Sequence, residues 1–212
     1  MTLPRLVLAI ESAVAGGSLS LLRDGSEIAN WTGTAEVSKG EDLLFNIDAM
    51  LKGAGVEKKD IGQIAVSAGP GSFTGIRIGI ATALGLKNGL GVEMSSVSAL
   101  RAIIVSSEQV GHPLVAAIPM GRNAFCFQQF DIANGELVEL HEPRTAPLTS
   151  LADTINETRE ATFLLHSSLV VLCPDDPRVI DAGSNIARSV GVACALSSEP
   201  FVEGPLFISK SF

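Results

Sequence analysis

The chain has 212 residues, 46% of them apolar, and a formal net charge of −8 from 15 basic and 23 acidic side chains. This length and apolar content suit one or two globular domains that fold around their own core without disulfide or metal crosslinks. The acidic balance argues against tight binding to a nucleic-acid backbone, which requires clustered Lys and Arg. Nine Phe, one Trp and no Tyr also leave few stacking platforms for single-stranded nucleic acid. Composition therefore does not indicate a nucleic-acid-binding protein.

Cysteine usage and hydropathy indicate a cytoplasmic protein without a membrane segment. Three cysteines without close spacing are typical of reduced thiols rather than of a disulfide framework. They are Cys126, Cys173 and Cys194. The apolar run Leu6–Ile10 is too short for the core of a signal peptide. The longest weakly charged region, residues 78–86, is much shorter than the roughly 20 residues needed to cross a bilayer.

The first half of the sequence predicts strands first and helices afterwards. Short apolar runs predict strands at residues 6–12, 18–22, 27–32 and 64–66. Asp24-Gly25, between the second and third runs, is a strong hairpin signal. Ser38 and Glu41 have the spacing of a helix capping box, and apolar residues then recur at helical spacing from Leu43 to Leu51. Further helices are predicted from a glycine-rich loop to about residue 89 and over residues 98–106.

The second half repeats the same order of elements. Strands are predicted at residues 114–118, 125–132, 137–140 and 163–165, and helices at residues 150–158 and 184–190. Asn134-Gly135 supplies a second hairpin signal. This repetition predicts two closely packed α/β lobes rather than one sandwich, an N-terminal lobe over residues 1–110 and a C-terminal lobe over residues 111–212.

One loop between a predicted strand and a predicted helix stands out. It reads Gly69, Pro70, Gly71, Ser72, Phe73, Thr74 and Gly75. Backbone N–H groups of such a turn can bind an anion at the helix N-terminus. Alternatively, the glycines permit a tight turn and the close packing of another element. The phosphate-binding, dinucleotide and nucleophile-elbow patterns all fail here, because no Lys follows Gly75 and because Pro70 and Thr74 stand where glycine is required.

The helix after this loop carries a stripe of small residues. Gly75, Gly79 and Ala83 recur every fourth residue, beside an apolar stripe of Ile76, Ile80 and Leu84. Glycine inside a helix costs about 0.5–1 kcal/mol relative to alanine, so the close approach of another helix should offset that cost. That neighbour is either part of the same chain or a partner subunit.

Three segments together resemble the bacterial TsaB (YeaZ) family. They are Leu8-Ala9-Ile10-Glu11-Ser12, Leu43-Leu44-x-x-Ile47 and, above all, residues 69–79 with Arg77. The resemblance covers the first half of the chain continuously and the second half in outline. It implies the α/β fold shared by actin, sugar kinases and Hsp70 chaperones (the ASKHA fold), with two lobes that each contain a mixed sheet and helices.

The resemblance also implies a function. TsaB proteins take part in making threonylcarbamoyladenosine beside the anticodon of tRNA, as partners of the catalytic, metal-binding paralogue TsaD. An ATPase subunit, TsaE, joins them. We therefore expect a scaffold subunit without catalytic residues or metal ligands, in contact with tRNA only indirectly and able to form a homodimer when alone. No intrinsic cofactor is expected; ATP or ADP would bind only weakly or at an interface between subunits.

The family pairs with TsaD through the region of the small-residue helix. The expected partner interface is therefore Gly75, Ile76, Gly79, Ile80, Ala83 and Leu86. The chain departs from the family pattern at three places: Glu11 replaces Asp, Lys39 replaces His, and Pro119-Met120-Gly121 replaces Asp-Ala-Arg, with Arg122 as the nearest substitute for the lost arginine. These departures weaken an inherited ligand site and leave partner binding unaffected.

The alternative function is an enzyme that uses the glycine-rich loop, either a nucleotide- or anion-binding enzyme or an M22-type glycopeptidase-like hydrolase. The histidines do not favour it, because His112, His141 and His166 are too far apart for the His-x-x-x-His metal motif of TsaD.

Three further features of the sequence are weaker indications of a site. Asp175, Asp176 and Asp181 suggest a cation site but lie in a predicted solvated loop. Cys173 with His166 suggests a nucleophile pair but lacks a third orienting group. The apolar residues 205–208 suggest a segment that docks on the body or on a partner.

Overall fold

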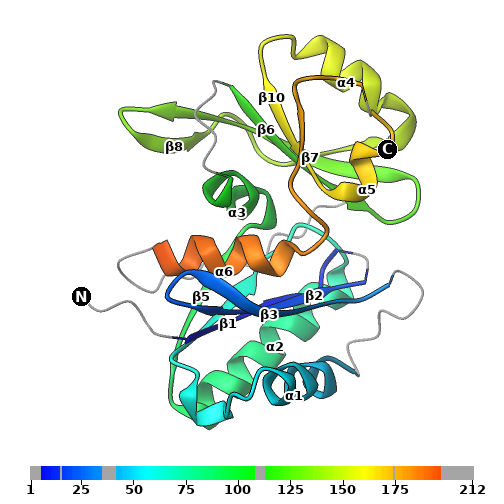
Figure 1. The fold of residues 1–212 in the computed structure, drawn as a ribbon. Coiled ribbons are helices and arrows are strands. Elements are labelled where there is room, and N and C mark those ends of the chain that lie inside the picture. The colour runs from blue at the N-terminus through cyan, green and yellow to red at the C-terminus, as the bar shows by residue number, and fades with distance from the viewer. Residues whose placement is uncertain (1–5, 15, 35–41, 108–112, 174, 197–212) are drawn as a thin grey trace.

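The computed structural model describes residues 6–14, 16–34, 42–107, 113–173 and 175–196. These residues form two sheets with helices below, between and above them, so that five layers alternate between helices and strands (Figure 1). This arrangement is the two-lobed α/β architecture that the repeated element order predicts. Among the described residues, no helix is both long and apolar enough to cross a membrane.

The first sheet has the order β3-β2-β1-β4-β5. Its strands are β1 (Leu6–Glu11), β2 (Ser18–Arg23), β3 (Ser26–Thr32), β4 (Gln63–Ser67) and β5 (Glu93–Val97). Strands β1, β2 and β3 are antiparallel neighbours, whereas β4 and β5 run parallel to β1. All six residues of the central strand β1 are buried, while β3 alternates between exposed and half-buried residues, as an edge strand does.

The second sheet repeats this topology, with the order β11-β10-β6-β7-β8 and β9 paired to β7. Its strands are β6 (Leu114–Met120), β7 (Ala124–Ala133), β8 (Glu136–Glu139), β9 (Arg144–Pro147), β10 (Thr162–Leu165) and β11 (Val179–Asp181). Again three antiparallel strands are followed by two parallel ones. The two sheets therefore have related topology, although their sequences show no obvious repeat.

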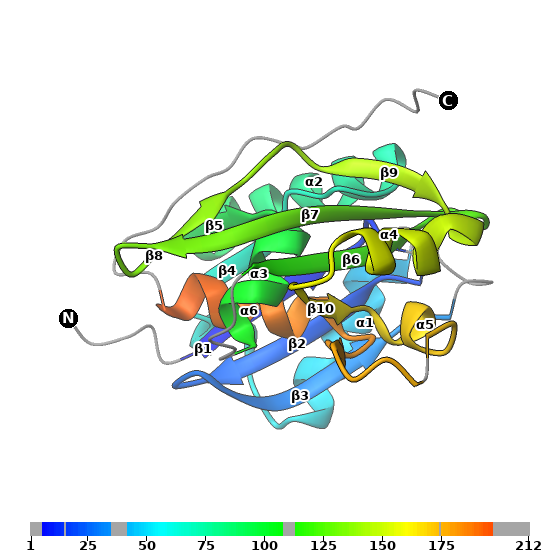
Figure 2. The ribbon, with the colours of Figure 1, turned by 90° about the horizontal axis from the view of Figure 1, so that it is seen from above.

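Helices cover both faces of each sheet. They are α1 (Leu43–Gly53), α2 (Phe73–Leu90), α3 (Ala99–Ser106), α4 (Leu151–Glu157), α5 (Ser167–Val170) and α6 (Ile186–Leu196), with 3-10 turns at Lys58–Asp60 and Leu148–Ser150. Helices α1 and α2 lie on the outer face of the first sheet, and α4 and α5 pack on the outer face of the second (Figure 1). Strands β6 and β7 lie over α3 (Figure 2).

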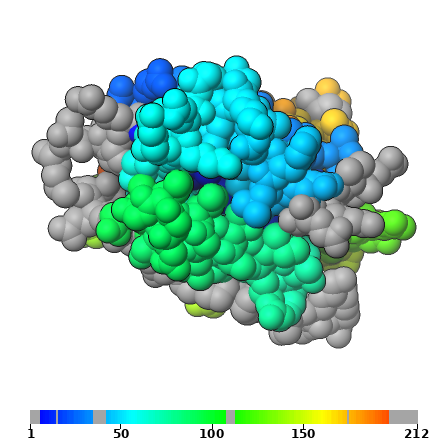
Figure 3. Space-filling view, turned by 90° about the horizontal axis from the view of Figure 1, so that it is seen from below, coloured from blue at the N-terminus to red at the C-terminus, as the bar shows by residue number. Residues whose placement is uncertain are grey.

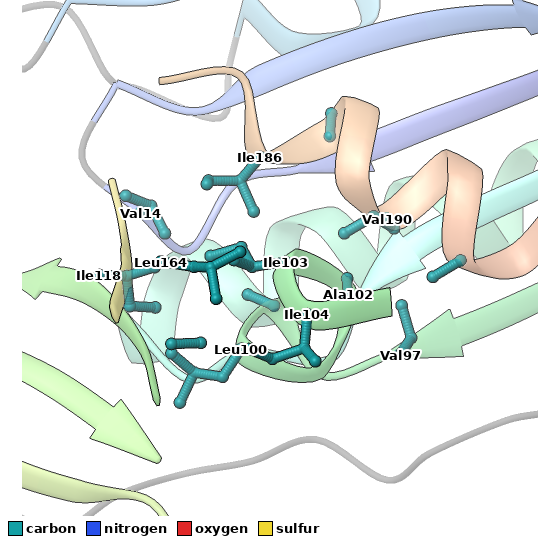
Figure 4. Packing of buried hydrophobic residues seen from close by; sticks show 14 of the residues in the cluster. Val14, Val97, Leu100, Ala102, Ile103, Ile104, Ile118, Leu164, Ile186 and Val190 are labelled. Carbon is teal, nitrogen blue, oxygen red and sulfur yellow. The ribbon is translucent and has the colours of Figure 1, made fainter. Parts of the chain in front are cut away.

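The largest core cluster lies between the sheets. It combines side chains from β1, β5 and α3 with others from β6, β10 and α6, among them Val97, Ile103, Ile118, Leu164 and Val190 (Figure 4). Helix α6 comes from the last part of the described chain yet packs on β1 and β2 of the first sheet. The N–H of Ala187 donates to Ser18 Oγ (3.0 Å), which fixes the start of α6 on β2.

Most predicted elements are present, and the differences have local causes. The hydropathy pattern does not predict strand β5, because two of its buried residues are serines. One of them, Ser95, accepts a hydrogen bond from Gln63 Nε2 through its Oγ. The short elements β9, α5 and β11 are also absent from the prediction. Helix α6 continues beyond its predicted end at Val190, because Gly191 packs its backbone against Leu22 and Ala9 and does not end the helix.

Several sequence predictions lie outside the described residues. They concern the capping box of Ser38 and Glu41, Lys39, His112, residues 205–208 and the point at which the chain divides after residue 110.

Candidate functional site

The glycine-rich loop joins the carboxyl end of β4 to the start of α2 and is bonded to the rest of the first lobe. The N–H of Ala68 donates to the carbonyl of Val97 (2.8 Å), and the N–H of Ala99 donates to the carbonyl of Gly69 (2.7 Å). The loop is thus held against the connection between β5 and α3. Ser72 begins α2, because its hydroxyl accepts from the N–H of Gly75 as an N-cap.

The turn between β1 and β2 lies directly against this loop. Ser12 Oγ donates to the carbonyl of Gly75 (2.8 Å), and the N–H of Ser72 donates to the carbonyl of Ala13 (2.7 Å). A Cβ atom at Gly71 would overlap the carbonyl oxygen of Ala13, and one at Gly75 would overlap that of Ser12. These glycines are therefore required because two backbone segments of the same chain approach closely.

This packing bears on the anion-binding interpretation of the loop. The N–H of Gly69 donates to Ser67 Oγ, that of Ser72 to Ala13, and those of Gly75 and Ile76 to Ser72. These four backbone donors of the loop and the first turn of α2 are thus already bonded within the chain. The geometry fits the alternative interpretation, in which the glycines serve close packing.

The small-residue stripe of α2, which is the expected partner interface, packs largely within its own lobe. Ile76 and Ala83 are 1% and 0% exposed, and a Cβ at Gly79 would overlap Ser12 Oγ. Ile80 and Leu86, which are half-buried, pack against the core of the first lobe. The stripe therefore lies on the sheet and the β1–β2 turn. Helical spacing indicates which residues share a face but not which neighbour that face contacts.

The opposite face of α2 is exposed, and apolar side chains occupy it. Phe73 is 55% exposed and Leu84 is 42% exposed. The guanidinium of Arg77 lies over the ring of Phe73, 5.3 Å from its centroid. Helix α1 adds Leu44 and Phe45, which are 58% and 72% exposed. The two helices lie side by side on the outer surface of the first lobe (Figure 3). We call these four apolar side chains the outer face.

The outer face could be anticipated only in part. Leu44 belongs to one of the segments that carry the family resemblance, and Leu84 belongs to the apolar stripe of α2. Phe73 appears in the sequence only as a member of the glycine-rich loop. Nothing in the sequence shows that these side chains point to solvent, because both helices have apolar residues on more than one side.

Glu11, one of the departures from the family pattern, is the most perturbed carboxyl group near the loop. It ends β1 and is 1% exposed. Its Oε1 accepts from the backbone N–H groups of Ala13 (2.5 Å) and Val14 (2.9 Å). Burial raises the pKa of Glu11 to about 7, although both hydrogen bonds act in the opposite direction. Its carboxyl group therefore closes the β1–β2 turn on which the glycine-rich loop rests.

Of the other departures, Lys39 lies outside the described residues, and Pro119-Met120-Gly121 lies in the second lobe. Pro119 and Met120 end β6, and Gly121 follows in a left-handed conformation with φ of 67°. Arg122 and Asn123 complete an exposed turn into β7, where the carbonyl of Asn123 accepts from the N–H of Leu148 (2.9 Å).

The suggested cation site is engaged in other contacts. Both carboxylate oxygens of Asp176 accept from the guanidinium of Arg178, at 2.7 and 3.0 Å, which lowers the pKa of Asp176. Asp181 accepts from Ser167 Oγ and from the N–H of Gly183. Within the described ranges, no group of three or more His, Cys, Asp or Glu side chains could hold a metal ion.

Cys173 and His166, the suggested Cys–His pair, each have an environment of their own in the structure. His166 is 8% exposed, and its Nδ1 accepts from the N–H of Ser168 at the start of α5. Burial lowers the pKa of His166, while the backbone of Ser184 and the charge of Asp181 oppose that shift. Burial also raises the pKa of the Cys173 thiol, which does not favour a nucleophilic thiolate.

Comparison with known proteins finds similar sequences and similar folds. Residues 35–157 match the family model of TsaD, tRNA N6-adenosine threonylcarbamoyltransferase. The tRNA threonylcarbamoyladenosine biosynthesis protein TsaB of Bacillus subtilis is 23% identical over 163 residues, which is 76% of this chain and 71% of that protein. The TsaB of Escherichia coli is 36% identical over 94 residues, 44% of this chain and 40% of that protein. The matched segments thus range from under half to about two thirds of the relatives' lengths.

Solved structures extend the likeness in fold to most of the chain. YeaZ from Pseudomonas aeruginosa superposes with a TM-score of 0.62 at 22% identity, covering 87% of this chain and 89% of that one. A second Pseudomonas aeruginosa structure, described as an uncharacterized protein with similarity to peptidase YeaZ, gives a TM-score of 0.64 at 21% identity and covers 92% and 94%. The predicted two-lobed α/β fold is confirmed, and it is the fold of YeaZ.

Proposed function

The chain belongs to the TsaB/YeaZ family, and on that premise we propose that it takes part in the biosynthesis of threonylcarbamoyladenosine in tRNA as a non-catalytic subunit that pairs with a TsaD protein. The outer face of α1 and α2 is the surface that pairs. TsaE joins the complex, tRNA is contacted by the partners, and the chain acts in the cytoplasm. The same surface forms a homodimer when the chain is alone.

One observation carries this proposal: four large apolar side chains on α1 and α2 are exposed to solvent. Phe45 and Leu44 on α1 and Phe73 and Leu84 on α2 are each at least 42% exposed. Neighbouring exposed apolar groups on adjacent helices are typical of a surface that becomes covered in a complex. The Arg77–Phe73 pair adds a cation and an aromatic ring, two groups that are enriched at the centre of protein interfaces.

The electrostatics support a role next to the RNA rather than on it. The whole chain carries a formal charge of −8, and the outer face contributes apolar groups rather than a cationic stripe. The glycine-rich loop is bonded to its own lobe, which supports a structural role rather than a site for nucleotide or for hydrolysis. We therefore assign the chemistry of the tRNA modification to TsaD.

The experiment measures the affinity of the purified chain for the TsaD of the same organism by titration calorimetry. Leu84→Glu and Phe45→Glu place a charge on the outer face and should weaken binding at least tenfold. Val171→Glu is the matched control, because Val171 is 71% exposed in the second lobe, away from α1 and α2. All three variants should melt close to the wild type, since each position is at the surface.

Retention of wild-type affinity by both Leu84→Glu and Phe45→Glu would contradict the assignment of the surface. Modification of tRNA by the partner proteins, measured with and without this chain, tests the function itself and should fall when the chain is omitted. A clear rise of the Tm with ATP, ADP or divalent cations would instead support a ligand-binding enzyme.

A further inference from the structure

Glu11 connects the interior of the first lobe with the start of α2. Its carboxyl group is buried at the end of β1, and its Oε1 accepts from the N–H groups of Ala13 and Val14. Those residues form the turn that covers it. The turn is closed further by a hydrogen bond from the N–H of Gly17 to the carbonyl of Val14 (2.9 Å).

The same turn is bonded to α2 on its other side. Ser12 Oγ donates to the carbonyl of Gly75, and the carbonyl of Ala13 accepts from the N–H of Ser72. Gly71 lies so close to Ala13, and Gly75 to Ser12, that no methyl group fits between the segments. The turn therefore cannot move away from Glu11 without breaking the bonds that hold the first turn of α2.

Within the described ranges, no ion pair or charged hydrogen-bond partner joins Glu11 to the elements packed around it. Its neighbour on β2 is Ser18, and the influences on its carboxyl are burial and the two backbone N–H groups. The cationic side chains of the elements around it are exposed or half-buried: Arg23 on β2, Arg77 and Lys87 on α2, and Arg188 on α6. The acidic residue of β5, Glu93, is exposed, and β4 carries no titratable group. In the described part of the chain, an ionised Glu11 is thus a buried charge whose two hydrogen bonds both come from one turn.

We propose that the β1–β2 turn is a proton-operated latch: when Glu11 loses its proton, the turn opens more readily, water reaches the carboxylate, and the N-terminus of α2 is released. Protonated Glu11 keeps the turn closed because a neutral carboxyl group is buried at much lower cost than a carboxylate. The proton goes to solvent, so the latch responds to pH without any other ligand.

Linkage gives the size of the effect. The closed turn raises the pKa of Glu11 to about 7 from the ordinary value of 4.5, whereas an open turn leaves it near the ordinary value. Because the open form binds the proton less tightly, opening becomes more favourable as pH rises between these values. A pKa of about 7 in the closed form and 4.5 in the open form corresponds to an increase of up to about 300-fold in the opening equilibrium constant. Most of this change is expected between about pH 5 and pH 7.

Hydrogen exchange measured residue by residue tests the latch. The amide of Ser72, which donates to Ala13 across the turn, should lose protection as the pH rises from about 5 to 8, after correction for intrinsic exchange. In Glu11→Gln, which keeps the shape and an acceptor oxygen but has no charge, its protection should not change with pH. Ser12→Ala removes a bond between the turn and α2 and should lower protection at every pH by one factor.

A second readout uses Trp31, the only tryptophan. Its ring lies against Gly33, which packs on Gly16 at the far end of the turn, and the N–H of Gly33 donates to the carbonyl of Gly17 (3.0 Å). Trp31 fluorescence should therefore change with pH in the wild type and stay constant in Glu11→Gln. The amide of Leu148, which donates to the carbonyl of Asn123 in the second lobe, is the control. Equal pH dependence at Ser72 and Leu148, or a pH-dependent Glu11→Gln, would overturn the latch.

The consequence for binding rests on the proposed function. Phe73 and Arg77 lie in the first turns of α2, so opening the latch displaces part of the outer face. The affinity for TsaD should be lower at pH 8 than at pH 6 in the wild type and independent of pH in Glu11→Gln. If no pairing occurs at either pH, the proposed function fails while hydrogen exchange still decides on the latch.

Discussion

Gly79 on α2 offers a direct test of why this helix carries glycines. A Cβ atom there would overlap Ser12 Oγ, and its next neighbours are Ser12 Cβ at 3.6 Å and Val66 Cγ2 at 3.7 Å, both ordinary contacts. The hydroxyl of Ser12 is therefore the obstacle. In Gly79→Ala it must turn away and lose its hydrogen bond to the carbonyl of Gly75.

The energetic terms have opposite signs. The lost hydrogen bond costs about 1 kcal/mol, and crowding costs about 1–3 kcal/mol. Alanine in place of glycine inside a helix contributes about 0.5–1 kcal/mol of stability. We expect Gly79→Ala to lower the free energy of unfolding by about 2 kcal/mol. Combining it with Ser12→Ala removes the obstacle, so the double variant should be close to the wild type.

Urea unfolding followed by circular dichroism measures these differences. Gly85→Ala on the same helix is the matched control, because no atom lies within 4 Å of a Cβ at that position, and it should stabilise the chain. If Gly79→Ala were as stabilising as Gly85→Ala, or if Ser12→Ala did not rescue it, the close-packing explanation would be refuted. A leucine at position 79 would disturb the fold itself and so could not test partner binding alone.

Three further predictions concern charged groups. Because the pKa of Glu11 is higher in the folded than in the unfolded chain, the free energy of unfolding should fall by ~3 kcal/mol as pH rises from about 5 to 8, and urea titrations of Glu11→Gln should not show this fall. Arg178→Ala should lower the calorimetric Tm, because Arg178 binds Asp176 and the carbonyls that end α4; an unchanged Tm would contradict this role. The Arg101–Glu139 pair, 32% and 43% exposed, should yield less than about 1 kcal/mol in a double-mutant cycle.

Local signals in the sequence determined the turns and the central strands. Asp24-Gly25 and Asn134-Gly135 both form hairpin turns with positive φ, as Asx-Gly pairs favour, since these residues tolerate that backbone conformation. The fully buried strand β1 follows from a continuous apolar run. The family resemblance rests above all on residues 69–79. In the structure, the same segment is hydrogen-bonded to the β1–β2 turn.

Only the tertiary structure decided what each helix face meets. The spacing of Gly75, Gly79 and Ala83 predicts one shared face, but the neighbour proved to be Ser12, which is 63 residues away from Gly75 in sequence. Helix α6 likewise crosses to the first sheet although it follows the strands of the second. Length, composition and charge limited the possible classes of protein. Each of them is a sum over all residues, so it does not depend on which residues are in contact. Packing depends on which distant segments meet, and a pattern of three or four residues does not contain that information.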